Sequence, residues 1–176
     1  MTANFTTTIT VDATPQKAFD AINDVPAWWG RITGSTTAVG DEFVYVVPGL
    51  HYSGFRVTDI EPARRIAWLV TGSYLDFTAD KQEWNGTTVR FDIQEADGGT
   101  RVTFTHEDLK PDDECYDVCS NAWGMFVNGS LKALIETGVG QPYSFDGDEA
   151  LTAADHAELH HQVAAAAKAA NNNNGS

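Results

Sequence analysis

The sequence predicts an α+β fold, in which a curved antiparallel sheet of about six or seven strands is wrapped around one long C-terminal helix. Apolar and polar residues alternate through most of the chain up to His106, which is the period of half-buried strands. Turns rich in glycine, proline and aspartate separate these alternating runs. One strongly helical pattern, Pro111 to Gly138, follows the last of them. It is the element able to cover the apolar face of such a sheet.

The chain opens with one strand and two short helices. Phe5 to Val11 alternates apolar residues with threonines and has a high β-propensity. Pro15 marks the start of a short helix over Gln16 to Asn23, because proline suits the first helical position. A turn or second short helix then carries the adjacent Trp28 and Trp29.

A series of alternating runs predicts the rest of the sheet. Turns at Glu61–Arg64 and Asp97–Gly99 separate consecutive strands, and glycine in the second turn accepts a positive φ. No clear period runs through Thr71 to Lys81, where we expect a loop. The expected strands lie in Phe43–Val47, Tyr52–Ile60, Ile66–Val70, Val89–Ile93 and Val102–His106.

The long helix carries a wide apolar arc. Pro111 suits its first turn, and Gly138 suits a left-handed C-terminal cap. Two adjacent apolar stripes run along it, one through Ala122 and Phe126 and the other through Trp123. The first stripe contains several small side chains, so it leaves volume that a fully packed core would fill.

Length and composition predict one domain followed by a tail. The chain has 176 residues and 42% apolar residues, enough for a core. We place the domain at 1–140 and a C-terminal extension at 141–176. Within the extension, Asp146–Ala170 has the composition of an alanine-rich helix, and Asn171–Ser176 is of low complexity and predicted to be disordered.

Charge excludes several classes of partner. The 25 acidic and 11 basic residues give a net charge of −14, which argues against nucleic acid and anionic membrane surfaces. The sequence has no apolar run of membrane-spanning length and no N-terminal signal segment. We therefore expect an acidic cytoplasmic protein with reduced cysteines.

The order of these elements and their residues resembles the SRPBCC superfamily, also called START-like or birch-pollen-allergen-like. Within it, the chain is similar to the branch of homologues of the activator of heat-shock-protein-90 ATPase. The resemblance covers Asn4 to Gly138 and implies a helix-grip fold with a cavity between helix and sheet. The matching segments are Val11–Phe19, Trp28–Gly30, Gly40–Phe43, Gly54–Arg64, Gly99–His106 and Trp123–Gly138.

Members of this superfamily bind apolar molecules in the cavity, so the resemblance implies a lipid-like, polyketide-like or aromatic ligand. Two alternatives remain open: a cyclase- or hydrolase-type enzyme that uses the same cavity, and a stand-alone chaperone-interaction module. We expect no cofactor, and as partners a small apolar molecule and either a chaperone or a second copy in a homodimer. The expected lining residues, chosen as inward aromatic or helix-face positions, are Trp29, Tyr45, Phe55, Trp68, His106, Ala122, Trp123 and Phe126.

His106 is the one candidate catalytic residue, because it is expected to face inward at the end of the last strand. A neutral histidine there is either a hydrogen-bonding anchor in the core or a general base. His106, Cys115 and Cys119 do not fit a recognised zinc spacing. His156 and His160 lack the glutamate that the metalloprotease pattern places after its first histidine. We expect no metal site.

Overall fold

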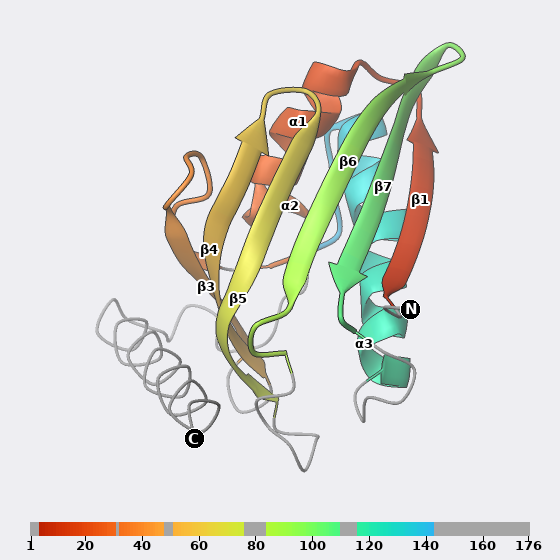
Figure 1. Cartoon of the computed structure of the whole chain (residues 1–176). Coiled ribbons are helices and arrows are strands. Elements are labelled where there is room, and N and C mark those ends of the chain that lie inside the picture. The colour runs from red at the N-terminus through yellow and green to blue at the C-terminus, as the bar shows by residue number, and fades with distance from the viewer. Residues whose placement is uncertain (1–3, 31, 48–50, 76–83, 110–115, 143–176) are drawn as a thin grey trace.

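The computed structural model describes residues 4–30, 32–47, 51–75, 84–109 and 116–142 (Figure 1). Within these residues, seven strands form one antiparallel sheet in the order β1-β7-β6-β5-β4-β3-β2. The strands are β1 (Phe5–Val11), β2 (Ile32–Gly34), β3 (Glu42–Val47), β4 (His51–Glu61), β5 (Arg65–Leu75), β6 (Thr88–Ala96) and β7 (Gly99–Glu107). All neighbours except β1 and β7 are consecutive in the chain, so β2 to β7 form a meander and β1 adds to it as an edge strand beside β7.

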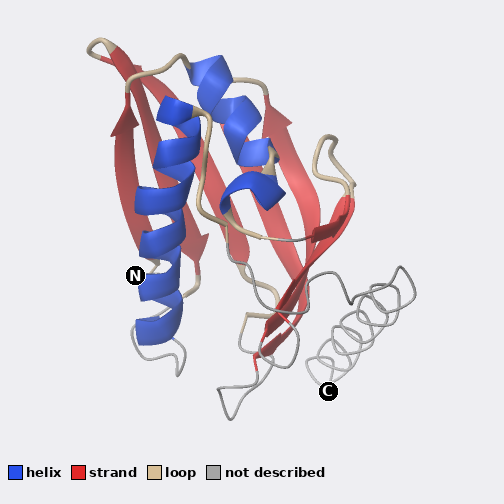
Figure 2. Cartoon of the chain, turned by 180° about the vertical axis from the view of Figure 1, so that it is seen from behind, coloured by secondary structure: helices blue, strands red, loops and turns tan. Residues whose placement is uncertain are grey.

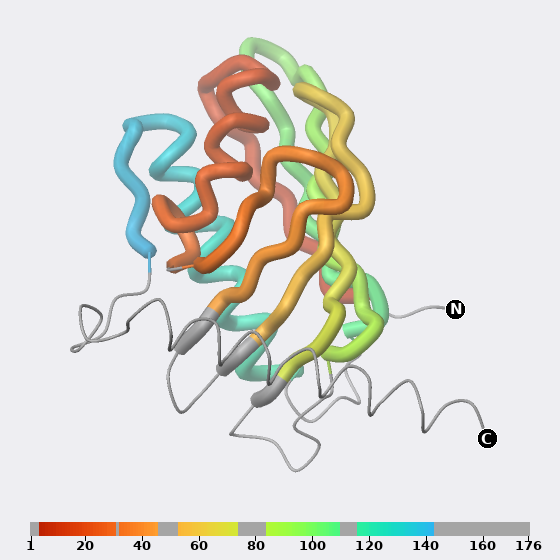
Figure 3. The backbone as a smooth tube through the Cα atoms, turned by 90° about the vertical axis from the view of Figure 1, so that its left-hand side faces the viewer, coloured from red at the N-terminus to blue at the C-terminus, as the bar shows by residue number. Residues whose placement is uncertain are grey.

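The described helices lie on one face of this sheet, as Figures 2 and 3 show from behind and from the side. The short helices are α1 (Pro15–Asn23) and α2 (Val25–Trp28). The long helix consists of α3 (Tyr116–Gly124), the π-helix η1 (Met125–Leu131) and α4 (Lys132–Thr137). The predicted α+β helix-grip fold is therefore confirmed. No helix in the described part of the chain is long and apolar enough to span a membrane.

Local sequence signals explain where the elements begin and end. The Thr14 side chain caps α1 by accepting a hydrogen bond from the Lys17 amide at 3.1 Å. The β6–β7 hairpin turns at Gly98, whose φ of 76° favours glycine, and Gly138 ends α4 with a φ of 83°. The predicted turns at these positions are confirmed.

The expected loop at Thr71–Lys81 is wrong for its first part, because β5 continues to Leu75. The pairing between β4 and β5 shifts register between Gly54 and Phe55, where Gly54 faces Gly72 but Phe55 faces Val70. A bulge of this kind breaks the two-residue period, so alternation no longer marks the strand beyond it. Residues 76–83 lie outside the described part.

The long helix departs from the regular α-helix that its sequence predicts. The predicted start at Pro111 lies outside the described residues, whereas the end at Gly138 is confirmed. In η1 the backbone bonds i→i+5, and Phe126, Val127, Ser130 and Leu131 are all buried. In α3, Trp123 is only 2% exposed, while Ala122, expected on the innermost stripe, is half-buried.

The chain after the long helix is held against α2. A Cβ built on Gly140 would lie 2.2 Å from the Ala27 carbonyl oxygen, so only glycine permits this approach. The Gln141 amide donates to Ser130 Oγ at 2.6 Å, and Ser130 Oγ donates to the Trp28 carbonyl oxygen at 2.7 Å. The chain is thus attached to the domain as far as Gln141. The predicted extension 141–176 stays a prediction, because residues 143–176 lie outside the described part.

Truncation after Phe145 is expected to leave the melting temperature nearly unchanged. The removed sequence contains few apolar residues larger than alanine to bury, and the contacts of Gly140 and Gln141 are retained. Thermal melts followed by circular dichroism test this, with truncation after Gly138 as the matched control. The control removes the segment packed against α2 and should melt several degrees lower. A large loss of stability in the longer truncation would show that 146–176 packs on the domain.

Candidate functional site

Aromatic rings gather between the helices and the sheet around Trp29, the residue that follows α2. Trp29 is 3% exposed and stacks on Tyr45 of β3, with ring centroids 3.9 Å apart and planes at 11°. Its ring centroid lies 4.7 Å from that of Trp123 in α3, 5.6 Å from that of Phe55 in β4 and 6.5 Å from that of Trp68 in β5. The structure therefore brings together five of the eight residues expected to line a ligand site.

The other three expected residues lie at the margins of this cluster. His106 of β7 is fully buried, with its ring centroid 6.0 Å from that of Trp123. Phe126, in η1, is 7% exposed and belongs to the same core, and the half-buried Ala122 packs against it. The lining role of all eight residues stays a proposal.

The hydrogen bonds of His106 have a defined direction. Nδ1 accepts from Trp123 Nε1 at 3.1 Å, and an indole nitrogen can only donate. The proton of the neutral ring must then be on Nε2, which donates to Thr87 Oγ1 at 2.8 Å. The Thr87 hydroxyl in turn donates to the Trp84 carbonyl oxygen at 2.6 Å. This series of hydrogen bonds joins the long helix to β7 and to the segment before β6.

This geometry favours the hydrogen-bonding anchor over the general base among the two roles expected for His106. A general base needs a free nitrogen lone pair, and the lone pair of Nδ1 is engaged by Trp123. His106 would have to break that bond to accept a proton from a substrate. A catalytic role for His106 stays a prediction.

Sequence analysis missed a row of small polar residues on the same side of the sheet. Ser53 of β4 pairs with Tyr45 on one side and with Ser73 of β5 on the other, and both serines are fully buried. Ser73 Oγ donates to Asn85 Oδ1 at 2.9 Å. The signal was the interruption of two apolar strands by serine and glycine at adjacent pairs, Ser53–Gly54 and Gly72–Ser73.

Apart from Arg65 Nε, which forms an ion pair with Asp59, two buried nitrogen donors have no hydrogen-bond partner within the described structure: Trp68 Nε1 and Asn85 Nδ2. Trp68 is fully buried, with its ring centroid 5.0 Å from that of Phe43 and 5.1 Å from that of Phe91. A buried donor left without an acceptor is unfavourable by about 1–3 kcal/mol. An oxygen atom of a bound ligand would remove this penalty.

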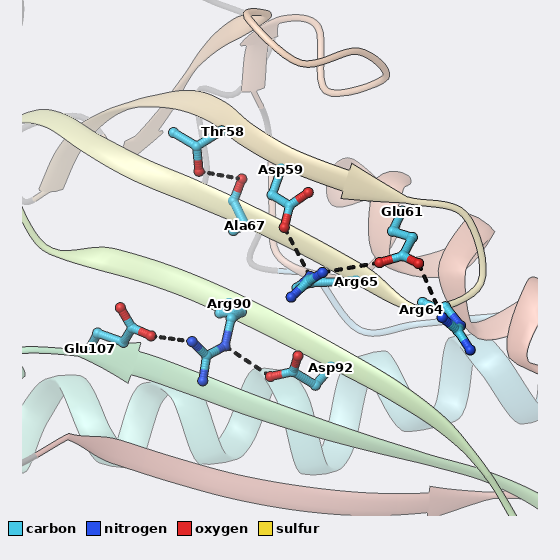
Figure 4. Close-up of polar contacts among 9 residues, drawn as sticks. All are labelled: Thr58, Asp59, Glu61, Arg64, Arg65, Ala67, Arg90, Asp92 and Glu107. Carbon is cyan, nitrogen blue, oxygen red and sulfur yellow. Dashed lines mark hydrogen bonds and ion pairs between the residues drawn. The ribbon is translucent and has the colours of Figure 1, made fainter.

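A hollow of about 560 Å³ lies on the opposite, outer face of the sheet, at the β4–β5 turn. Figure 4 shows its ion pairs: Arg65 contacts Asp59 at 2.9 Å and Glu61 at 3.0 Å, and Arg64 contacts Glu61 at 3.2 Å. Hydrogen bonds from Arg64 and then Arg65 hold the pKa of the Glu61 carboxyl below its usual value. These charges already pair with one another, so the aromatic interior is the better candidate site.

The sequence of residues 12–136 matches the family model described as Activator of Hsp90 ATPase homolog 1-like protein. No curated protein sequence matches the chain. Among solved structures, the Aha1 dimer from Colwellia psychrerythraea is similar, with 26% identity and a TM-score of 0.65 over 78% of this chain and 99% of that one.

Two further solved structures, both below 25% identity, show the fold alone. DynU16, described as a putative protein in the dynemicin biosynthetic locus, has 18% identity and a TM-score of 0.62 over 80% of this chain and 49% of that one. A protein from Mesorhizobium loti has 14% identity and a TM-score of 0.61 over 75% of this chain and 95% of that one.

Proposed function

Because the chain belongs to the Activator of Hsp90 ATPase homolog 1-like family, we propose that it binds a small apolar ligand between the sheet and the long helix. The aromatic cluster around Trp29 supplies an apolar, π-rich surface for a lipid-like, polyketide-like or aromatic body. A protein of this fold in a biosynthetic locus supports a small-molecule ligand by analogy.

The observation that carries the proposal is the unpartnered Trp68 Nε1. The indole N–H groups of two other buried tryptophans have acceptors: Trp28 Nε1 donates to the Ile22 carbonyl oxygen at 3.1 Å, and Trp123 Nε1 donates to His106. By contrast, the indole N–H of Trp68 has no acceptor among the described residues. The ligand that completes the site therefore carries a hydrogen-bond acceptor on an apolar body.

The net charge of the protein favours a neutral hydrogen-bond acceptor on the ligand. The chain carries a net charge of −14, which disfavours an anionic ligand over a neutral one of the same shape. A ketone or quinone oxygen accepts a hydrogen bond from Trp68 without adding charge to a desolvated interior. The proposed ligand class is thus an apolar molecule with a neutral carbonyl oxygen.

Matched ligands test this class. We expect the wild-type chain to bind 2-acetylnaphthalene more tightly than 2-ethylnaphthalene by a factor of about 2 to 10, since one neutral hydrogen bond contributes about 0.5–1.5 kcal/mol. Trp68→Phe keeps an aromatic ring but removes the donor, so this preference should disappear while binding of the ethyl compound remains. Isothermal titration calorimetry measures both. Failure of the wild type to bind either compound, or a preference that survives Trp68→Phe, would contradict the proposal.

Trp28→Phe is the matched control, because it removes the same atoms from an equally buried indole. It also leaves the Ile22 carbonyl oxygen without its donor, whereas Trp68→Phe removes a donor that has no partner. Trp68→Phe should therefore destabilise the chain by about 1–3 kcal/mol less than Trp28→Phe in urea denaturation. Equal losses would mean that the Trp68 N–H is satisfied in solution.

A second proposal is self-association. The Colwellia psychrerythraea protein is a dimer, and it matches this chain over 99% of its own length. We propose that this chain also forms a homodimer. Enzyme activity, chaperone contact and a cytoplasmic location stay predictions from the sequence.

A further inference from the structure

The two edges of the sheet differ in how they are protected. Natural sheets guard an edge strand with charges, prolines, bulges or a very short strand, because its unpaired backbone groups would otherwise pair with another chain. β2 has three residues and is short. β1, with the sequence FTTTITV, has seven residues, no charged residue and no proline, and pairs with β7 over seven consecutive positions without a bulge. Figure 1 shows β1 at the edge of the sheet beside β7.

We propose that β1 pairs antiparallel with β1 of a second copy of this chain, about a two-fold axis at Thr8, so that the two sheets become one. The inference deepens the proposed homodimer by naming its surface, and it is independent of ligand binding. In this register Thr8 faces its own counterpart, and Thr6 faces Thr10 of the partner subunit. Phe5 then faces Val11 of the partner subunit, and Thr7 faces Ile9 of the partner subunit.

This register is self-complementary on the outer face of the sheet. Thr6, Thr8 and Thr10 are all exposed there. A two-fold axis at Thr8 pairs each of them with a threonine, and cross-strand threonine pairs are favourable in antiparallel sheets. An axis at any other residue would move at least one threonine out of this set of pairs.

The inner face also favours this register. Val11 and Ile9 are 1% and 5% exposed, whereas Phe5 and Thr7 are half-buried. The antiparallel register places the half-buried end of one strand beside the buried end of the other. Pairing then covers part of the remaining exposed surface of Phe5 with the partner subunit's strand, which adds apolar burial.

Charge favours β1 over the rest of the surface. Two copies with a net charge of −14 each repel one another, and β1 carries no ionisable side chain.

The residues that flank β1 limit the length of the proposed strand pairing. The Asp12 amide donates to Glu136 Oε2 at 3.1 Å, and Asn4 Oδ1 accepts from the Asp108 amide at 3.0 Å, so side chains of the same copy engage the residues that flank β1.

Analytical ultracentrifugation of the full chain over a range of concentrations tests the surface. An interface made largely by one strand is small, so we expect a dimer with a dissociation constant roughly in the micromolar range. Thr8→Lys places like charges directly opposite each other and should weaken the dimer about tenfold or more. Thr103→Lys is the matched control. Thr103 lies on β7 and pairs with Thr8 within the same copy, so a lysine at this position should leave the dimer unchanged.

Disulfide cross-linking tests the register without relying on destabilisation. Thr8→Cys should cross-link to its counterpart, because directly opposite Cα atoms lie within disulfide reach. Thr6→Cys alone should not exceed the wild-type background, but a mixture of Thr6→Cys and Thr10→Cys should cross-link. A monomeric wild type, a dimer insensitive to Thr8→Lys, or equal cross-linking of Thr6→Cys and Thr8→Cys would overturn the inference. None of these results bears on binding of the naphthalene ligands.

Discussion

Trp123→Ala should lower the free energy of unfolding by about 3–5 kcal/mol, which would place it among the most damaging single substitutions in the chain. Trp123 is 2% exposed, and its ring centroid lies 4.6 Å from that of Phe104 and 4.7 Å from that of Trp29. The substitution leaves a cavity between the long helix and the sheet. It also removes the buried hydrogen bond that Trp123 Nε1 donates to His106 Nδ1.

Urea denaturation followed by circular dichroism measures this loss. Met125→Ala is the matched control, since Met125 lies two residues further along the same helix but is 62% exposed. It should change stability by no more than about 0.5 kcal/mol. Trp123→Phe should fall between the two, because it retains a ring but not the indole N–H. A Trp123→Ala variant as stable as Met125→Ala would mean that the long helix does not pack on the sheet through this residue.

Most of the fold follows from local signals in the sequence. β1 matches its predicted limits, Phe5–Val11, because alternation and threonine content persist through the whole strand. The turns at Gly98 and Gly138 were predictable because each requires a positive φ. The end of β5 was not predictable, since the register shift at Gly54 and Phe55 depends on pairing between two strands and interrupts the alternation of β5.

The site was predictable only in part. Trp29, Tyr45 and Trp68 meet because strand parity and the apolar helix face direct them to one side, and parity can be read from sequence. The partners of the indole N–H groups cannot be read in this way. Trp123 finds its acceptor on β7, 17 residues away in the sequence, and the lack of an acceptor for Trp68 is known only once every neighbour is placed.

The phase of the long helix shows the same limit. The sequence pattern places Ala122 on the innermost stripe, but Ala122 is half-buried, whereas Trp123, Val127 and Leu131 on the adjacent stripe are at most 2% exposed. The π-helix η1 begins two residues after Trp123 and changes the residue spacing along the buried face. A widened turn of this kind depends on the sheet against which the helix packs, and such segments are frequent at functional sites.

Trp29→Ala should be the second most damaging substitution, also by about 3–5 kcal/mol. Trp29 has ring contacts with Tyr45, Phe55, Trp68 and Trp123, so its truncation removes packing from four neighbouring aromatic side chains at once. Its removal leaves an indole-shaped hole inside the proposed ligand site. The same substitution therefore tests both the packing of the core and its ability to accept an apolar molecule.

Added indole should restore part of the stability lost in Trp29→Ala, because a ligand that binds only the folded state stabilises it by mass action. The gain is about 2.7 kcal/mol when the indole concentration is 100 times its dissociation constant. Thermal melts with and without indole measure it, with Met125→Ala as the control, because truncation of an exposed side chain leaves no cavity and indole should not raise its melting temperature. A Trp29→Ala variant that is strongly destabilised yet gains nothing from indole would show that the interior collapses around the missing ring. A site that collapses in this way does not hold open the space that an apolar ligand requires, and the proposed binding function would then lose its physical basis.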